Sequence, residues 1–86
     1  MADPVMTNLT ALTITKVATG VQTGTIHLVS WQPDQYWYDY RQTTEAAPTN
    51  LNTAVQATDK TLEIQSATSI DVYIYCLQPA TIVIAV

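Results

Sequence analysis

Apolar and polar residues alternate with a period of two along much of this chain, and this pattern predicts β-strands. In residues 12–17, Leu12 and Ile14 lie on one face of the expected strand and two threonines lie on the other. Residues 25–31 alternate in the same way, with Ile26 and Leu28 on one face and His27, Val29 and Trp31 on the other. The only two glycines of the chain stand between these segments, four positions apart, and predict a turn or an irregular connection.

The second half of the chain continues the alternation and adds aromatic residues. Residues 36–41 place three tyrosines on one face and Trp37, Asp39 and Arg41 on the other, which favours a strand over a helix. Residues 42–61 show no clear period, so we expect mostly loop there. Further strands are expected at residues 53–57, 61–65, 69–77 and 81–86, the last of them covered on both faces because it is almost wholly apolar.

Five to seven short strands joined by turns predict an all-β fold, namely a small antiparallel β-sandwich or barrel. Residues 1–10 are expected to form an extended N-terminal arm that orders against a neighbour or stays mobile. Residues 11–86 are expected to form a single β domain, since 86 residues suffice for one domain.

Charge is scarce, because 12% of the residues are Asp, Glu, Lys or Arg, against about 25% in a typical soluble domain. The net charge of −4 includes only three basic residues, Lys16, Arg41 and Lys60, which are too few to neutralise nucleic-acid phosphates. The longest apolar run, residues 72–77, is far shorter than the roughly 20 residues that span a bilayer, and the N-terminus lacks the parts of a signal peptide. We therefore expect a soluble protein made in a cytoplasm, with neither nucleic acid nor membrane as a partner.

The small size of the chain favours self-association. A domain of this length has a thin core, and such domains are often stabilised by disulfides, metals or oligomerisation. One cysteine, Cys76, and one histidine, His27, exclude an internal disulfide and the usual zinc-ligand sets. The uncharged, β-prone run at residues 82–86 must also be paired and covered. Together with 15 threonines on a weakly charged surface, these features favour a homo-oligomer or a docked partner.

No residue pattern in the chain indicates catalysis. His27 is the only histidine available as a base, and its apolar neighbours favour an ordinary half-buried side chain. Cys76 alternates in register with aliphatic residues and is interpreted as a small core residue. The seven carboxylates occur singly, without a glycosidase pair or a calcium loop, and the glycines match no phosphate-binding loop. We therefore expect no enzyme activity, no catalytic residue, no cofactor and no metal.

One sequence-local feature has the composition of a recognition site: five of the seven aromatic residues fall within ten positions, followed by an arginine. Aromatic residues and Arg are enriched at binding hot spots, so one interpretation is a protein interface. Flat rings also stack on sugar faces, and in a chain without phenylalanine the same rings could equally form the core. The candidate residues are Trp31, Tyr36, Trp37, Tyr38, Tyr40 and Arg41.

Several whole-chain features occur together: a weakly charged β-rich composition, the arm at residues 1–10, threonine-rich strands and a closing hairpin that starts with residues 71–76. In this combination the chain resembles small virion proteins of tailed phages, in particular head decoration or cement proteins. The resemblance implies a virion subunit, a homo-oligomer such as a trimer, that binds a larger structural protein such as a major capsid protein. Its arm would reach neighbouring subunits, and binding to the assembled shell alone would stabilise that shell by mass action.

Two other classes of function stay open. A small carbohydrate-binding or lectin-like module would expose several roughly coplanar rings in the segment from Trp31 to Tyr40. An enzyme would need a cleft that joins His27 to a carboxylate or to Cys76.

Overall fold

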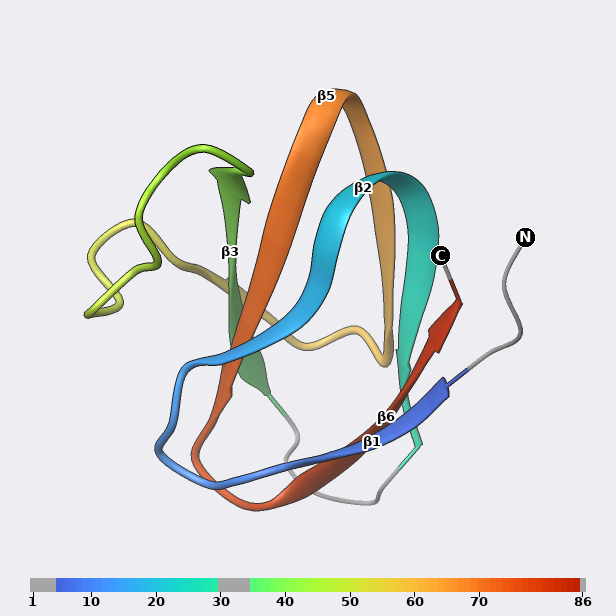
Figure 1. Ribbon diagram of the computed structural model, residues 1–86. Helices are drawn as coiled ribbons and strands as arrows, with labels where there is room; N and C mark the ends of the chain where they lie inside the picture. Colours follow the sequence, from blue (N-terminus) through green and yellow to red (C-terminus); the bar gives the residue numbers. More distant parts are fainter. Residues whose placement is uncertain (1–4, 30–34, 86) are drawn as a thin grey trace.

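The computed structural model describes residues 5–29 and 35–85, which form six antiparallel β-strands and, within these ranges, no helix (Figure 1). This confirms the all-β fold class that the alternation predicts. Residues 5–9 of the predicted arm pair with the last strand of the same chain. In chain order the strands are β1 (Val5–Leu9), β2 (Thr15–Leu28), β3 (Tyr36–Gln42), β4 (Val55–Ala57), β5 (Thr61–Cys76) and β6 (Ala80–Ala85).

Two of the strands are long, because each joins two segments that the sequence pattern separates. β2 has 14 residues and β5 has 16. Where a turn or an irregular connection is expected, β2 continues through a series of register shifts, with a φ of 62° at Gly20 and of 156° at Gly24. Glycine adopts positive φ angles without a steric penalty, so the strand passes through bulges at this point and does not end.

The strand expected at residues 12–17 begins only at Thr15. Leu12 lies in a turn with a φ of 58° and is 65% exposed. Its backbone N–H donates a hydrogen bond to the Cys76 carbonyl oxygen at 2.8 Å, which ties this turn to the end of β5. The expectation that Leu12 shares a strand face with Ile14 is therefore wrong, because a positive φ takes the residue out of the pleated conformation.

The strands form one sheet in the order β1-β6-β2-β5-β3-β4. The first half of β2 pairs with the second half of β5, and the second half of β2 pairs with the first half of β5. Both strands bend at their middle, so the sheet folds over on itself into two facing layers (Figure 1). One layer contains β1, β6 and the adjoining half of the β2–β5 ladder, and the other contains the remaining half with β3 and β4. The result has the character of a small β-sandwich.

The closing hairpin expected from residues 71–76 is not present. β6 follows β5 after a short turn but pairs with β1 and β2 in the other layer. The physical reason is that both edges of β5 are already occupied: Ile74, for example, lies opposite Thr15 of β2 and opposite Tyr38 of β3. With no free edge beside it, the chain crosses to the other layer before the next strand begins.

The core lies between the two layers. β6 has one buried and one half-buried face and is paired along both edges, so the chain covers its own apolar C-terminal strand. This strand therefore gives no reason of its own to expect a partner. Side chains from both layers surround one small internal space: Ile26, Leu28, Tyr36, Ile74, Cys76 and Ile82.

Candidate interaction surfaces

The aromatic segment of β3 is divided between two faces of the sheet. The register with β5 places Tyr36 beside Cys76 and Tyr38 beside Ile74, so the tyrosines face the other layer. Trp37, next to Tyr75 in that register, points to the outside of the sandwich, on the same face of β3 as Asp39 and Arg41. Trp31 lies outside the described residues. The candidate cluster is thus two separate groups of side chains, and they cannot form one continuous binding surface.

The three tyrosines form a row that runs from the core to the surface. The ring centroids of Tyr36 and Tyr38 lie 6.4 Å apart at an interplanar angle of 47°, and those of Tyr38 and Tyr40 lie 5.2 Å apart at 39°. Tyr36 is 4% exposed, whereas Tyr40 is 37% exposed. Burial, followed by the proximity of Tyr38, raises the pKa of Tyr36 to about 12, and burial also raises the pKa of Tyr40. Only the Tyr40 end of the row is available to a partner.

On the outer face, the indole of Trp37 meets the ring of Tyr75 edge-on, with centroids 5.9 Å apart and an interplanar angle of 72°. The loop between β3 and β4 covers part of these rings, and its Pro48 is buried. Sheets of this kind often leave one face to water. Here a loop turns the outer face of β3 and β5 into a second, smaller packed region.

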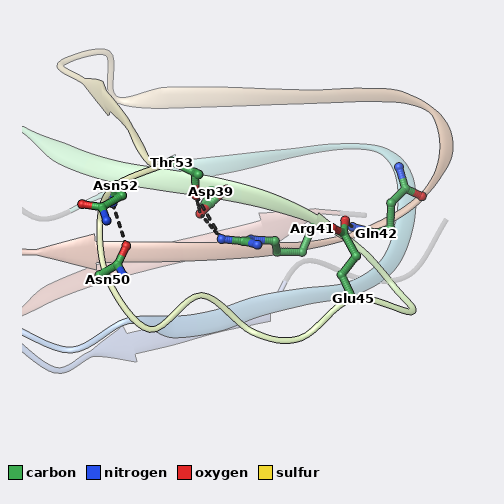
Figure 2. Close-up of polar contacts among 7 residues, drawn as sticks. All are labelled: Asp39, Arg41, Gln42, Glu45, Asn50, Asn52 and Thr53. Carbon is green, nitrogen blue, oxygen red and sulfur yellow. Dashed lines mark hydrogen bonds and ion pairs between the residues drawn. The ribbon is translucent and has the colours of Figure 1, made fainter.

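A polar cluster fastens this loop to β3 (Figure 2). The hydroxyl of Thr53 donates to Asp39 Oδ2 at 2.6 Å and accepts a hydrogen bond from Arg41 Nη2 at 3.0 Å. The same Arg41 nitrogen lies 3.5 Å from Asp39 Oδ2. Arg41, predicted as part of an interface, therefore has partners within the chain. Its charge is balanced there by the carboxylate of Asp39, a residue that is only 8% exposed.

Short-range hydrogen bonds hold the same loop near its beginning and near its end. The backbone N–H of Gln42 donates to Glu45 Oε1 at 2.7 Å, and the N–H of Asn52 donates to Asn50 Oδ1 at 2.9 Å (Figure 2). Side-chain oxygens of this kind replace the backbone acceptors that a turn lacks. The loop is thus fastened at several points and keeps a defined shape over β3.

An open groove lies where this loop meets the turn before β2. Its volume is about 530 Å³, and none of the residues that line it is charged. Exposed Leu12 lies at its rim, and the hydrogen bond from Leu12 to Cys76 brings exposed Leu77 to the same end of the molecule. We call this feature the Leu12 groove; it is lined by Leu12, Thr13, Ile14, Pro48, Thr49, Asn50, Leu51 and Tyr75.

The residues that line this groove are not among the candidates that the sequence predicts. Its lining comes from three separated parts of the chain, so no local cluster of residues in the sequence indicates it. The one available signal was Tyr75, which alternates with core residues in β5 and so had to face away from the core. Among the predicted candidates that the structure describes, Trp37 adjoins the groove, because it packs against the ring of Tyr75.

A second carboxylate, Asp71, fastens the bulge of β2. Asp71 is 3% exposed, and its Oδ1 accepts a hydrogen bond from the Gly20 N–H at 2.9 Å and one from the Thr43 hydroxyl at 3.4 Å. Its Oδ2 lies 3.5 Å from Lys16 Nζ. The Gly20 hydrogen bond, helped by Lys16 and opposed by burial, holds the pKa of Asp71 below its usual value. These contacts give Asp71 a structural role at the bend.

Of the two residues considered for catalysis, His27 lies on the outer surface of one layer and Cys76 lies in the core between the layers. His27 is exposed on the outer face of β2, 2.9 Å from the hydroxyl of Thr61, and is not the half-buried residue that was expected. Cys76 is 1% exposed in the core, as predicted, and burial raises the pKa of its thiol. Among the described residues, the internal space that Cys76 lines does not include His27. Within residues 5–29 and 35–85, no three His, Cys, Asp or Glu residues lie close enough together to hold a metal ion.

No protein-family model matches this chain, and neither does any curated protein or any solved structure. In the part of the chain that the structure describes, no helix could cross a membrane. Function is therefore inferred from the residues and contacts of this chain, above all from the Leu12 groove and the exposed strand edges.

Proposed function

We propose that this protein is a non-enzymatic virion subunit that binds a larger structural protein, such as a major capsid protein, and stabilises the assembled phage shell as a decoration protein does. The observation that carries the proposal is the Leu12 groove, with its uncharged lining and its open volume of about 530 Å³. Binding to the assembled shell, and not to free capsid subunits, would stabilise the shell by mass action and requires no chemistry.

The composition of the groove fits a protein partner. Leucine, isoleucine and proline side chains give it apolar walls, and Tyr75 contributes a ring with a polar end. A nucleic acid would require basic residues, and the lining has none. Thr13, Thr49 and Asn50 add polar groups to the lining, so the capsid segment that fits the groove would present apolar side chains together with groups that hydrogen-bond to these residues.

The groove is also held in shape before any partner arrives. The cluster of Asp39, Arg41 and Thr53 fixes one wall, and the hydrogen bond from Leu12 to Cys76 fixes the other. Pre-formed sites lose less conformational entropy on binding. Many copies on one shell would add avidity, so each groove needs only modest affinity.

The test is co-sedimentation of the protein with shells assembled from the major capsid protein encoded in the same genome. We expect the native protein to pellet with the shells and Leu12→Asp to bind about ten-fold more weakly or worse, because the new carboxylate would lose its water in an apolar contact. Aspartate tolerates a positive φ better than leucine does, so the variant should keep its fold.

The matched control is Val29→Asp, which places the same charge on a residue that is 45% exposed in the other layer, beside Thr81. This variant should bind shells as the native protein does. The proposal fails if the native protein does not bind shells, or if Leu12→Asp binds them as tightly as Val29→Asp.

Sugar binding is the alternative function, and the same purified protein can be used to test it. Within the described residues the rings of β3 are tilted against one another or lie on opposite faces, so they form no coplanar platform. If oligosaccharides quench the tryptophan fluorescence and the protein does not bind shells, a carbohydrate-binding function replaces the present proposal.

A further inference from the structure

β1 forms one edge of the sheet and pairs on one side only, with β6. Among the described residues no strand pairs with its other side. Alternate backbone N–H and C=O groups of an edge strand point away from the sheet, and another extended strand is the natural partner for them. The opposite edge of the sheet is β4, which has only three residues and offers a much shorter ladder.

β1 lacks the features by which proteins protect such edges. Residues Val5–Leu9 contain no charged residue and no proline, and their register with β6 has no bulge. Charge, proline and bulges are the usual means of preventing edge-to-edge pairing. Met6, on the outer face of the strand, is 69% exposed, so an apolar side chain stands where a lysine would protect the edge.

The apolar layer between the two halves of the sandwich also ends open at β1. Val5 and Leu9 lie on the same face of the strand, opposite Ile84 and Ala80 of β6. Leu9 is 4% exposed, but Val5 is 57% exposed. An added strand with an apolar residue opposite Val5 would extend the core over this uncovered end.

We propose that two copies of this chain pair through β1, antiparallel and about a two-fold axis, so that the sheet continues from one copy into the other. β1 fits itself in this geometry. A pairing centred on Thr7 places Val5 opposite Leu9 of the second copy, which continues the apolar face. It also places Met6 opposite Asn8 of the second copy, so no like charges meet across the axis.

The pairing does not depend on the proposed function, and the two can fail separately. A two-fold contact gives dimers or larger even-numbered assemblies. The resemblance to decoration proteins instead implies a trimer. A closed trimer without two-fold contacts would overturn the pairing through β1 and leave shell binding intact.

The experiment is light scattering coupled to size exclusion, applied to the full chain and to two charge variants. The native protein is expected to elute with the mass of a dimer. Met6→Lys with Asn8→Lys brings lysines face to face across the axis, and Met6→Glu with Asn8→Glu does the same with carboxylates. Each double variant alone should associate about ten-fold more weakly or worse.

Mixing the lysine and glutamate variants should restore the dimer, because opposite charges then face each other. This rescue separates a lost contact from a lost fold. Val55→Lys, on β4 at the other edge of the sheet, is the matched control and should remain dimeric. A monomeric native protein, a lysine variant that dimerises normally, or a mixture that stays monomeric would each overturn the proposal.

Discussion

The two faces of the layer built on β3 are both covered, but by different interactions. The inner face packs the tyrosine row and aliphatic side chains of β5 against the other layer. The outer face packs Trp37 and Tyr75 under a loop that Asp39 and Thr53 fasten. Residues Ile70–Ile74 of β5 are consequently buried on both faces. Alternation along a strand therefore separates two environments, and it does not by itself show which of them is solvent.

The two faces also differ in what they contribute. Contacts on the inner face are nondirectional and hold the sandwich together, so their loss should affect the whole fold. The outer face adds directional hydrogen bonds, which shape the loop beside the Leu12 groove. Variants on the inner face should therefore change global stability most, and those on the outer face should change local order.

The largest effect is expected on the inner face. Ile74 is 2% exposed and lies between the layers, so Ile74→Ala should lower the free energy of unfolding by about 2–5 kcal/mol through lost burial and an unfilled cavity. Urea unfolding followed by tryptophan fluorescence measures the change. Ile74→Val is the control and should cost about 0.5–1.5 kcal/mol. Equal costs for the two variants would show that Ile74 is not part of a packed core.

An intermediate effect is expected from alkali, again on the inner face. The pKa of Tyr36 is about 12 in the folded protein and about 10 in an unfolded chain, so tyrosinate forms first in the unfolded state. The contribution of Tyr36 to stability should be constant below pH about 10 and should be lost at about 1.4 kcal/mol per pH unit as the pH rises toward 12. Burial also raises the pKa of Cys76 and of Tyr40, so these two groups add to the alkaline loss of stability. Urea titrations across this range measure the slope.

Tyr36→Phe should remove the part of the alkaline slope that Tyr36 contributes between pH about 10 and about 12, whereas Tyr75→Phe keeps Tyr36 and should keep that part. If the Tyr36→Phe variant and the native protein lose stability in parallel above pH about 10, the buried position of Tyr36 is not the cause.

The smallest effect is expected on the outer face. Thr53→Val removes the hydroxyl that joins Asp39 to Arg41 and should cost about 1 kcal/mol. Amide hydrogen exchange should increase in the loop at residues 43–54 and stay unchanged in β6. Thr53→Ser keeps the hydroxyl and should protect the loop as the native residue does. Uniformly faster exchange throughout the sheet would contradict a local role for Thr53.

Local patterns predicted much of the fold. The alternation in β3 correctly separated the tyrosines from Trp37, and the apolar C-terminal run correctly marked β6. The glycines of β2 mark an irregularity, as expected, in the form of register shifts. The pattern did not show that the strand continues through them, because a bulge is a mismatch between two paired strands and leaves no period of its own. It failed at Leu12 because the turn there depends on a hydrogen bond to Cys76, far along the chain.

The candidate surfaces were harder to predict than the strands. The predicted candidates are aromatic residues that are neighbours in the chain. β3 divides those neighbours between two faces of the sheet. The Leu12 groove joins parts of the chain that only folding brings together. The free edge of β1 depends on the whole strand order, which no single segment encodes.

By itself, the sequence determined that the protein is all-β, where most strands lie and which side chains share a face. These properties follow from the two-residue repeat of an extended backbone and from the preferences of each residue, both of which act over a few positions. The tertiary structure alone decided what covers each face, which edge is free and where the groove lies. These properties depend on pairing between segments that are distant in sequence. Strands pair through backbone hydrogen bonds, which are the same for every residue except proline, so the sequence of one strand does not identify its partner.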